Sequence, residues 1–146
     1  MAQLVDAKSS QNASYANSIS IPVLATAQQI FAQLTLSTAG ATGPLNTLMT
    51  GTLAVQLPLL PVATSITITI VRGTNPSDLA IYSVRENLTL SVLGPQVISF
   101  TASDYNVPLP ANGQLTYTAF IGANVLGTVR VGPESFNATT YSGSLL

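Results

Sequence analysis

The segment Ser65–Gly73 constrains the fold more than any other part of the sequence. It reads Ser-Ile-Thr-Ile-Thr-Ile-Val-Arg-Gly, so an isoleucine stands at every second position with threonines between them. In a β-strand successive side chains point to opposite faces, and this pattern therefore places the isoleucines on one face. A helix would spread them around its circumference. Because β-branched residues also pack well on a pleated surface, the segment predicts a central strand of a sheet.

Short alternating segments separated by Gly, Pro and Asn make up most of the remaining chain. Nine or ten strands at roughly 10-residue spacing are typical of an all-β sandwich or barrel. Residues 26–36 also contain helix-favouring Ala and Gln, but the alternation of Ile30, Ala32, Leu34 and Leu36 predicts a strand with these four side chains on one face. Besides residues 65–73, the expected strands span residues 18–23, 28–37, 50–57, 79–84, 87–93, 96–101, 114–121, 125–131 and 134–141, with a longer connection at 104–112.

Charged residues make up only 6% of the chain, where about 25% is typical of globular domains. Ser, Thr, Asn and Gln together occupy 50 of the 146 positions, and the formal net charge is −1. Two surfaces of this kind can meet without removing ions from water, a step that is costly for every buried charge. The composition therefore favours permanent self-association, with a charge-poor soluble monomer as the alternative.

The residue inventory argues against an enzyme. Cysteine and histidine are absent, and the single lysine, Lys8, lies near the N-terminus. We therefore find no catalytic, cofactor-binding or metal-ligating set, and we expect the scattered charged residues to form structural ion pairs or turns. Four basic residues spread singly cannot form the stripe that nucleic acid requires, so we expect no nucleic-acid partner. The longest apolar run, 53–63, is too short to cross a bilayer, so we expect no membrane partner either.

Residues 1–17 differ from the rest and are predicted to form an N-terminal arm, with the β domain spanning residues 18–146. The arm is rich in Ala, Ser, Asn and Gln, and an isolated segment of this composition would be disordered. We therefore expect it to lie outside the core and to be held by a neighbouring copy. Leu4, Val5 and Tyr15 are its candidate assembly residues.

The strand rhythm resembles a known family of jelly-roll heads. The resemblance rests on Pro22 with Ala27–Leu36, on Ser65–Gly73 and on Leu115–Phe120. These stretches look like the tumour-necrosis-factor and complement type, and more closely like its versions on the exosporium of Bacillus-group spores, including the collagen-like exosporium glycoprotein and the F-type endospore appendage. The likeness covers about residues 18–146.

The resemblance implies an antiparallel jelly-roll sandwich of two sheets, assembled as a homotrimer. It also implies that the N-terminal segment links each trimer to the next in a fibre, or to an anchoring spore-surface protein. Proteins of this family are made in the mother-cell cytoplasm and reach the spore surface, which agrees with an N-terminus that does not read as a signal peptide. We predict a structural fibre subunit without a cofactor.

Three other classes of protein are compatible with a jelly roll. A non-fibrous exosporium head, or a head that binds a receptor or carbohydrate, would need a concave aromatic or polar site. A viral capsid-type jelly roll would explain self-association, although its nucleic-acid contact would need a basic arm. An enzyme is the third class, and it lacks an evident base or nucleophile.

Overall fold

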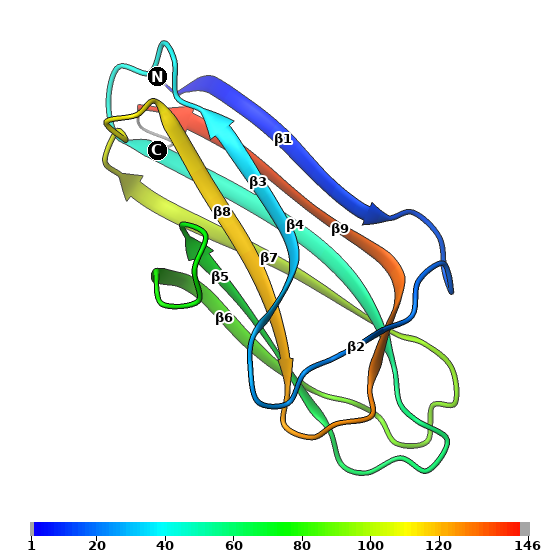
Figure 1. The fold of residues 1–146 in the computed structure, drawn as a ribbon. Helices are drawn as coiled ribbons and strands as arrows, with labels where there is room; N and C mark the ends of the chain where they lie inside the picture. Colours follow the sequence, from blue (N-terminus) through cyan, green and yellow to red (C-terminus); the bar gives the residue numbers. More distant parts are fainter. Residues whose placement is uncertain (1, 144–146) are drawn as a thin grey trace.

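Nine β-strands make up the fold within residues 2–143, the part of the chain that the computed structural model describes (Figure 1). Those residues contain no helix. The strands are β1 Gln3–Ala13, β2 Ile21–Pro22, β3 Gln29–Ser37, β4 Leu45–Gln56, β5 Ser65–Arg72, β6 Leu79–Asn87, β7 Gln96–Val107, β8 Gln114–Ala123 and β9 Val129–Ser142.

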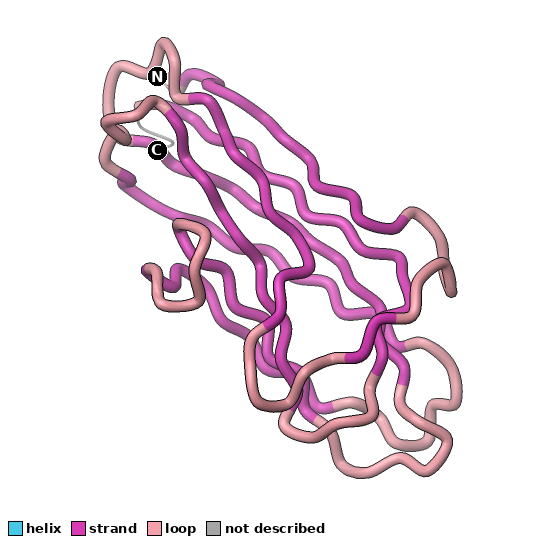
Figure 2. Tube along the Cα trace, in the orientation of Figure 1, coloured by secondary structure: helices cyan, strands magenta, loops and turns pink. Residues whose placement is uncertain are grey.

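The strands form two facing sheets, seen as two layers in Figure 2. The five-stranded sheet has the order β1-β9-β4-β7, with β2 also paired to β9, and the four-stranded sheet has the order β3-β8-β5-β6. Neighbouring strands are antiparallel throughout. The chain passes repeatedly from one sheet to the other, and this confirms the predicted antiparallel jelly-roll sandwich.

The isoleucine strand is central, as the sequence predicted. It forms β5, which pairs with β8 on one side and β6 on the other. Ile66, Ile68 and Ile70 are each at most 1% exposed and belong to the core between the sheets. Their alternation with threonine therefore reports a strand with one face buried in the sandwich.

One predicted face assignment, in β3, is wrong. The register of β3 against β8 shifts between Ile30 and Ala32, so Phe31 turns into the core while Ile30 is 49% exposed. Leu34 and Leu36 are buried as expected. A bulge inserts one residue and exchanges the faces before and after it, which strict alternation cannot anticipate.

Several strand boundaries also differ from the prediction. Of the expected strand 87–93, Asn87 is the last residue of β6 and residues 88–93 are a connection. There the backbone of Leu88 bonds to Thr64, and the side chain of Gln96 bonds to the backbone of Thr89. β4 begins five residues earlier than expected, at Leu45, and β7 continues to Val107. β9 is a single strand through Gly132–Pro133, where two strands had been expected. Of the expected strand 18–23, only Ile21 and Pro22 pair.

The N-terminal segment is part of the sandwich in this single chain. β1 pairs with β9 of its own chain from Gln3↔Ser142 to Ala13↔Glu134, so the expectation that a neighbouring copy is needed to hold this segment is corrected. The edge of β9 offers backbone groups that a polar strand can satisfy without burying many apolar side chains. Accordingly Ala13 is buried and Val5 packs against the core, whereas most other β1 side chains are exposed. The domain boundary after residue 17 and the connector role stay predictions.

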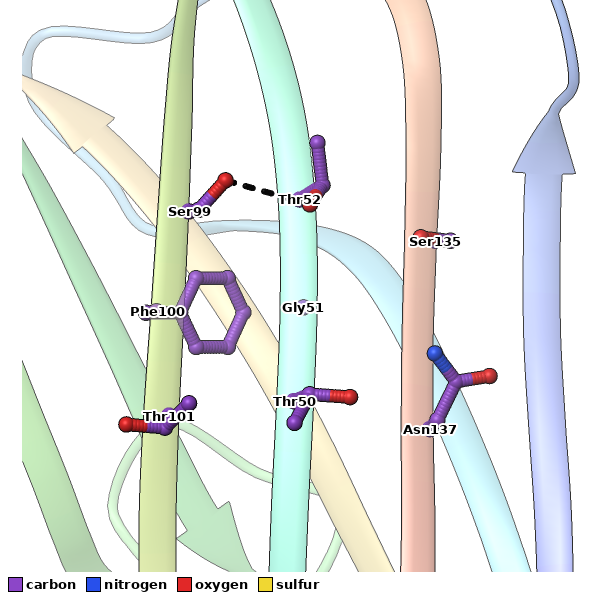
Figure 3. A pocket seen from close by; sticks show the side chains of 8 residues that line it. All are labelled: Thr50, Gly51, Thr52, Ser99, Phe100, Thr101, Ser135 and Asn137. Atoms are coloured by element: carbon purple, nitrogen blue, oxygen red, sulfur yellow. Dashed lines mark hydrogen bonds between the residues drawn. The ribbon is translucent and has the colours of Figure 1, made fainter.

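Gly51 leaves space that the ring of Phe100 fills. Figure 3 shows the ring directed from β7 towards Gly51 on β4. Gly51 lies between the buried positions Met49 and Leu53, so its missing side chain would point inward. A Cβ added there would lie 2.1 Å from Phe100 Cζ. Glycine is therefore required at this position by packing.

We predict that Gly51→Ala destabilises the protein by about 1–3 kcal/mol, because overpacking moves the Phe100 ring or the β4 backbone. Chemical denaturation measures the change. Gly43→Ala is the matched control, since an added Cβ there meets nothing within 4 Å. In a double-mutant cycle, Gly51→Ala should cost less in a Phe100→Leu background. Equal unfolding midpoints for the Gly51 and Gly43 variants would contradict this packing account.

Candidate interaction surfaces

The charged residues expected to form structural pairs are largely engaged within the chain. Arg130 Nε donates to Glu134 Oε2 at 2.6 Å, and both side chains are almost fully buried. Asn12 of β1 donates to the other carboxylate oxygen of Glu134 at 2.7 Å. Through Asn12, the ion pair on β9 is connected to β1.

A second ion pair lies inside the sandwich near the opposite end of β9. Arg72 donates to both carboxylate oxygens of Asp104 at 2.7 Å. The hydroxyl of Tyr117 donates to Asp104 at 2.8 Å and lies 3.1 Å from Thr47 Oγ1. Burial raises the pKa of Tyr117, so its phenol stays protonated and acts as a hydrogen-bond donor. The group therefore ties β5, β7 and β8 together.

Two further carboxylates bind backbone amides. Asp6 accepts hydrogen bonds from the amides of Ser37 at 2.7 Å and Ala7 at 2.9 Å, and the bond to Ser37 links β1 to β3. Asp78 accepts from the amides of Thr74 and Asn75 in the turn between β5 and β6. These bonds lower the pKa of both carboxyl groups.

One end of the sandwich carries most of the exposed apolar side chains of the loops. Four loops, 23–28, 57–64, 88–95 and 124–128, meet there, joined by backbone hydrogen bonds such as Val23 N to the Thr128 oxygen and Asn124 N to the Ser65 oxygen. We call this surface the apolar loop end. It exposes Leu24, Leu59, Leu60, Val62, Leu90, Val92, Leu93 and Leu126.

The opposite end is different. Its three loops, 38–44, 73–78 and 108–113, expose one large apolar side chain among the described residues, Leu109 at 45%. The described parts of both termini also lie at that end (Figure 1). Exposed apolar patches rimmed by polar residues mark interaction sites. The apolar loop end is therefore the leading candidate for a contact surface.

The outer face of the five-stranded sheet offers a shallow polar depression over Gly51 (Figure 3). Hydroxyl groups and one amide line it, and Thr52 Oγ1 lies 3.4 Å from Ser99 Oγ. Phe100, the aromatic residue there, is 5% exposed and its ring belongs to the core, so it offers no stacking surface for a sugar. The depression holds no ionisable side chain. The other lining residues are Thr50, Thr101, Ser135 and Asn137.

The three candidate assembly residues lie on different parts of the N-terminal segment. Leu4 is 58% exposed on β1 opposite Tyr141, and Tyr15 is 76% exposed in the loop that follows the strand. Val5 packs against the core of its own chain. The structure thus leaves Leu4 and Tyr15 accessible, and the assembly role of all three stays a prediction.

Residues 2–143 contain no group of three or more acidic, His or Cys side chains placed to hold a metal ion. Within the same range, no helix is long and apolar enough to cross a membrane.

We predict that Glu134→Gln destabilises the protein by about 3–5 kcal/mol, because it leaves the Arg130 guanidinium buried without a counter-charge. Glu86→Gln is the control, since Glu86 is exposed on β6. Thermal and urea unfolding compare the two variants. Replacing the pair together, as Arg130→Met with Glu134→Leu, should restore much of the loss. Indistinguishable unfolding of the Glu134→Gln and Glu86→Gln proteins would show that the pair is not needed.

A second prediction concerns pH. The folded-state pKa of Asp6 lies below its ordinary value of 3.8, so its stabilising effect is present above that pH and is lost as the pH falls through the lower value. We expect amide hydrogen exchange in β1 to increase at pH 3 relative to pH 6, after correction for intrinsic rates. Asp6→Asn should show faster exchange already at pH 6 and a smaller change. Equal protection of β1 in both proteins at pH 6 would argue against a role for Asp6.

Comparison with known proteins gives a fold but no family. No family model and no curated protein matches this sequence. Among solved structures, the chain is similar to a chain of the infectious bursal disease virus particle, with 9% identity over 97% of this chain and 35% of that chain, and a TM-score of 0.56.

Two further structures show weaker likeness. For the infectious bursal disease virus Gt strain the identity is 9%, the coverage 97% of this chain and 36% of the other, and the TM-score 0.48. For empty particles of cowpea mosaic virus the identity is 10%, both coverages are 90%, and the TM-score is 0.33. The chain spans about a third of the length of the bursal disease virus chains. At this identity the likeness with a TM-score of 0.56 supports the jelly-roll fold and nothing beyond it.

Proposed function

We propose that this protein is a structural subunit that assembles with further copies of itself. The observation that carries the proposal is the near absence of free ionised groups on an otherwise apolar and neutral polar surface. Arg130, Glu134 and Asp104 are buried in ion pairs, and Lys8, Arg85 and Glu86 are exposed. The half-buried Arg72, Asp6 and Asp78 are bonded within the chain. Copies can therefore meet over most of the surface without desolvating ions.

The N-terminal segment remains our candidate connector, and its pairing with β9 defines how it could act. Either the free edge of β1 pairs with a strand of another copy, or β1 leaves its own β9 and pairs with β9 of a neighbour. Both routes supply main-chain hydrogen bonds between copies. Leu4 and Tyr15 would add apolar contacts, and exchange of β1 would carry Val5 with it.

A fibre of stacked homotrimers on the spore surface is the form of assembly that the family resemblance implies. In this form the contacts between trimers are heterologous, and they propagate because their rotation does not close. An anchoring spore-surface protein would then hold one end of the fibre. The homotrimer, the fibre and the anchor on the spore surface are therefore all parts of what we propose.

A closed shell is the second form of assembly, and we include it by analogy with the bursal disease virus particle, a chain of which has a similar fold. That likeness lies in the jelly-roll fold, with a TM-score of 0.56 at 9% identity. The N-terminal segment argues against a capsid filled with nucleic acid, because Lys8 is the single basic residue in that segment. The two forms differ in symmetry and are distinct in a micrograph.

The test is negative-stain electron microscopy of the purified protein together with light scattering after size exclusion. We expect particles larger than one chain, in the form of filaments or shells. Deleting residues 1–15 should leave folded trimers that no longer polymerise, because the connector is lost. Leu4→Ser with Tyr15→Ser, which keeps β1, is the matched variant in case the deletion unfolds β9. A single-copy mass at all concentrations would contradict self-assembly, and fibres of unchanged length from both variants would remove the N-terminal segment from the mechanism.

A further inference from the structure

We propose that the apolar loop end is a docking surface for a second copy of this chain. The inference rests on the proposed self-assembly and names a surface for it that is separate from the N-terminal segment. It starts from the exposure of individual side chains. Leu59 is 99% exposed, Leu60 and Leu93 are each 89% exposed, and Leu126 is 71% exposed.

These leucines come from three different loops that the fold holds together. Leu88 N donates to the Thr64 oxygen at 2.9 Å, which joins loop 88–95 to loop 57–64. Ser65 N donates to Asn124 Oδ1 at 2.8 Å, which joins the start of β5 to loop 124–128. The leucines therefore lie on loops that are joined to one another at one end of the sandwich, and a contact there would remove apolar surface from water.

The charge distribution indicates what covers this surface. None of the residues in the four loops is Asp, Glu, Lys or Arg. The nearest charged residues in sequence are Arg85 and Glu86 at the end of β6, one of each sign, and Arg130 just after loop 124–128. Arg85 donates to Ser65 Oγ, and Arg130 is buried in its ion pair with Glu134. A surface that docks on an identical copy must not carry a net charge of one sign, because the two copies would then repel each other. The four loops carry no such charge.

A lipid surface fits the same observations less well. Loops that dock on membranes combine apolar side chains with Lys or Arg directed at anionic headgroups, and interfacial Trp or Tyr is common. The four loops contain no basic residue and no aromatic residue. Apolar burial against another protein surface therefore explains this end better than binding to a bilayer.

The position of the surface makes it compatible with the proposed connector. Leu4 and the described parts of both termini lie at the opposite end of the sandwich (Figure 1). A copy docked on the apolar loop end would leave Leu4 free. One subunit could therefore make contacts at both ends, as a growing assembly requires.

The experiment compares two sets of serine substitutions in the full chain. The test variant carries Leu59→Ser, Leu60→Ser, Leu93→Ser and Leu126→Ser. The control carries Leu79→Ser and Leu109→Ser, whose side chains are 60% and 45% exposed away from these loops. Leu59→Ser with Leu93→Ser is a milder test variant in case four changes impair folding. Circular dichroism and thermal unfolding establish that each protein is folded.

Light scattering after size exclusion gives the mass of each protein at several concentrations. We expect the wild type and the control to share one oligomeric mass, and the test variants to show a smaller species or at least a tenfold weaker association. A test variant with the wild-type mass and concentration dependence would overturn the docking surface but leave the proposed self-assembly standing. A wild type that is a single copy throughout would overturn both.

Flotation with neutral phosphatidylcholine vesicles covers the lipid alternative. We expect the wild type to remain unbound. A wild type that floats with the vesicles, together with a test variant that does not, would assign this end to lipid and overturn the proposal.

Discussion

The contact of Phe100 with residues of both sheets is the interaction on which the rest of the sandwich depends. Its ring lies 6.2 Å from that of Phe31 in an edge-to-face arrangement, 6.1 Å from that of Tyr82 and 6.3 Å from that of Phe136. Phe31 and Tyr82 belong to the two edge strands of the four-stranded sheet, β3 and β6. The ring fits only because Gly51 leaves space for it. One side chain therefore helps to hold the sheets in place, and with them the loops at both ends.

Hydroxyl groups take the place that charged side chains have on the surface of most domains. Thr35 and Thr116 lie 2.9 Å apart between β3 and β8, and Gln33 donates to Thr118 across the same pair of strands. Cross-strand pairs of this kind contribute modestly to sheet stability. They do not repel an approaching copy, because they are neutral. Neutral polar side chains in place of charged ones therefore form hydrogen bonds across the sheet surfaces and also remove the electrostatic barrier to association.

The sequence predicted the architecture because burial in a two-sheet sandwich imposes a period of two on each strand. Ile66 to Ile70 show this period without interruption, and their strand is central. The period fails at Phe31, where a bulge exchanges the faces, and in residues 88–93, where apolar residues recur in a connection. Neither feature leaves a local signal, since both depend on what lies across the sandwich.

The candidate surface was missed for a related reason. Its exposed leucines come from three distant segments of the sequence, and each could equally have been a core residue: Leu59 with Leu60, Leu93, and Leu126. Their common exposure appears only when the jelly-roll topology brings the loops to one end. Similarly, composition identified the N-terminal segment as unlike the rest, but the free edge of β9 decides that it joins a sheet.

β1 already pairs with β9 of its own chain, and this pairing limits how the strand could link copies. Most β1 side chains are exposed, so the strand is held largely by backbone bonds to β9, by Val5 and by the bonds of Asp6 and Asn12. A neighbour's β9 offers the same partners, and exchange therefore gains little energy by itself. A second contact between the same copies would raise their effective concentration and favour exchange. Assembly through β1 thus depends on another surface, and a charge-free apolar end is the part of this fold best suited to supply one.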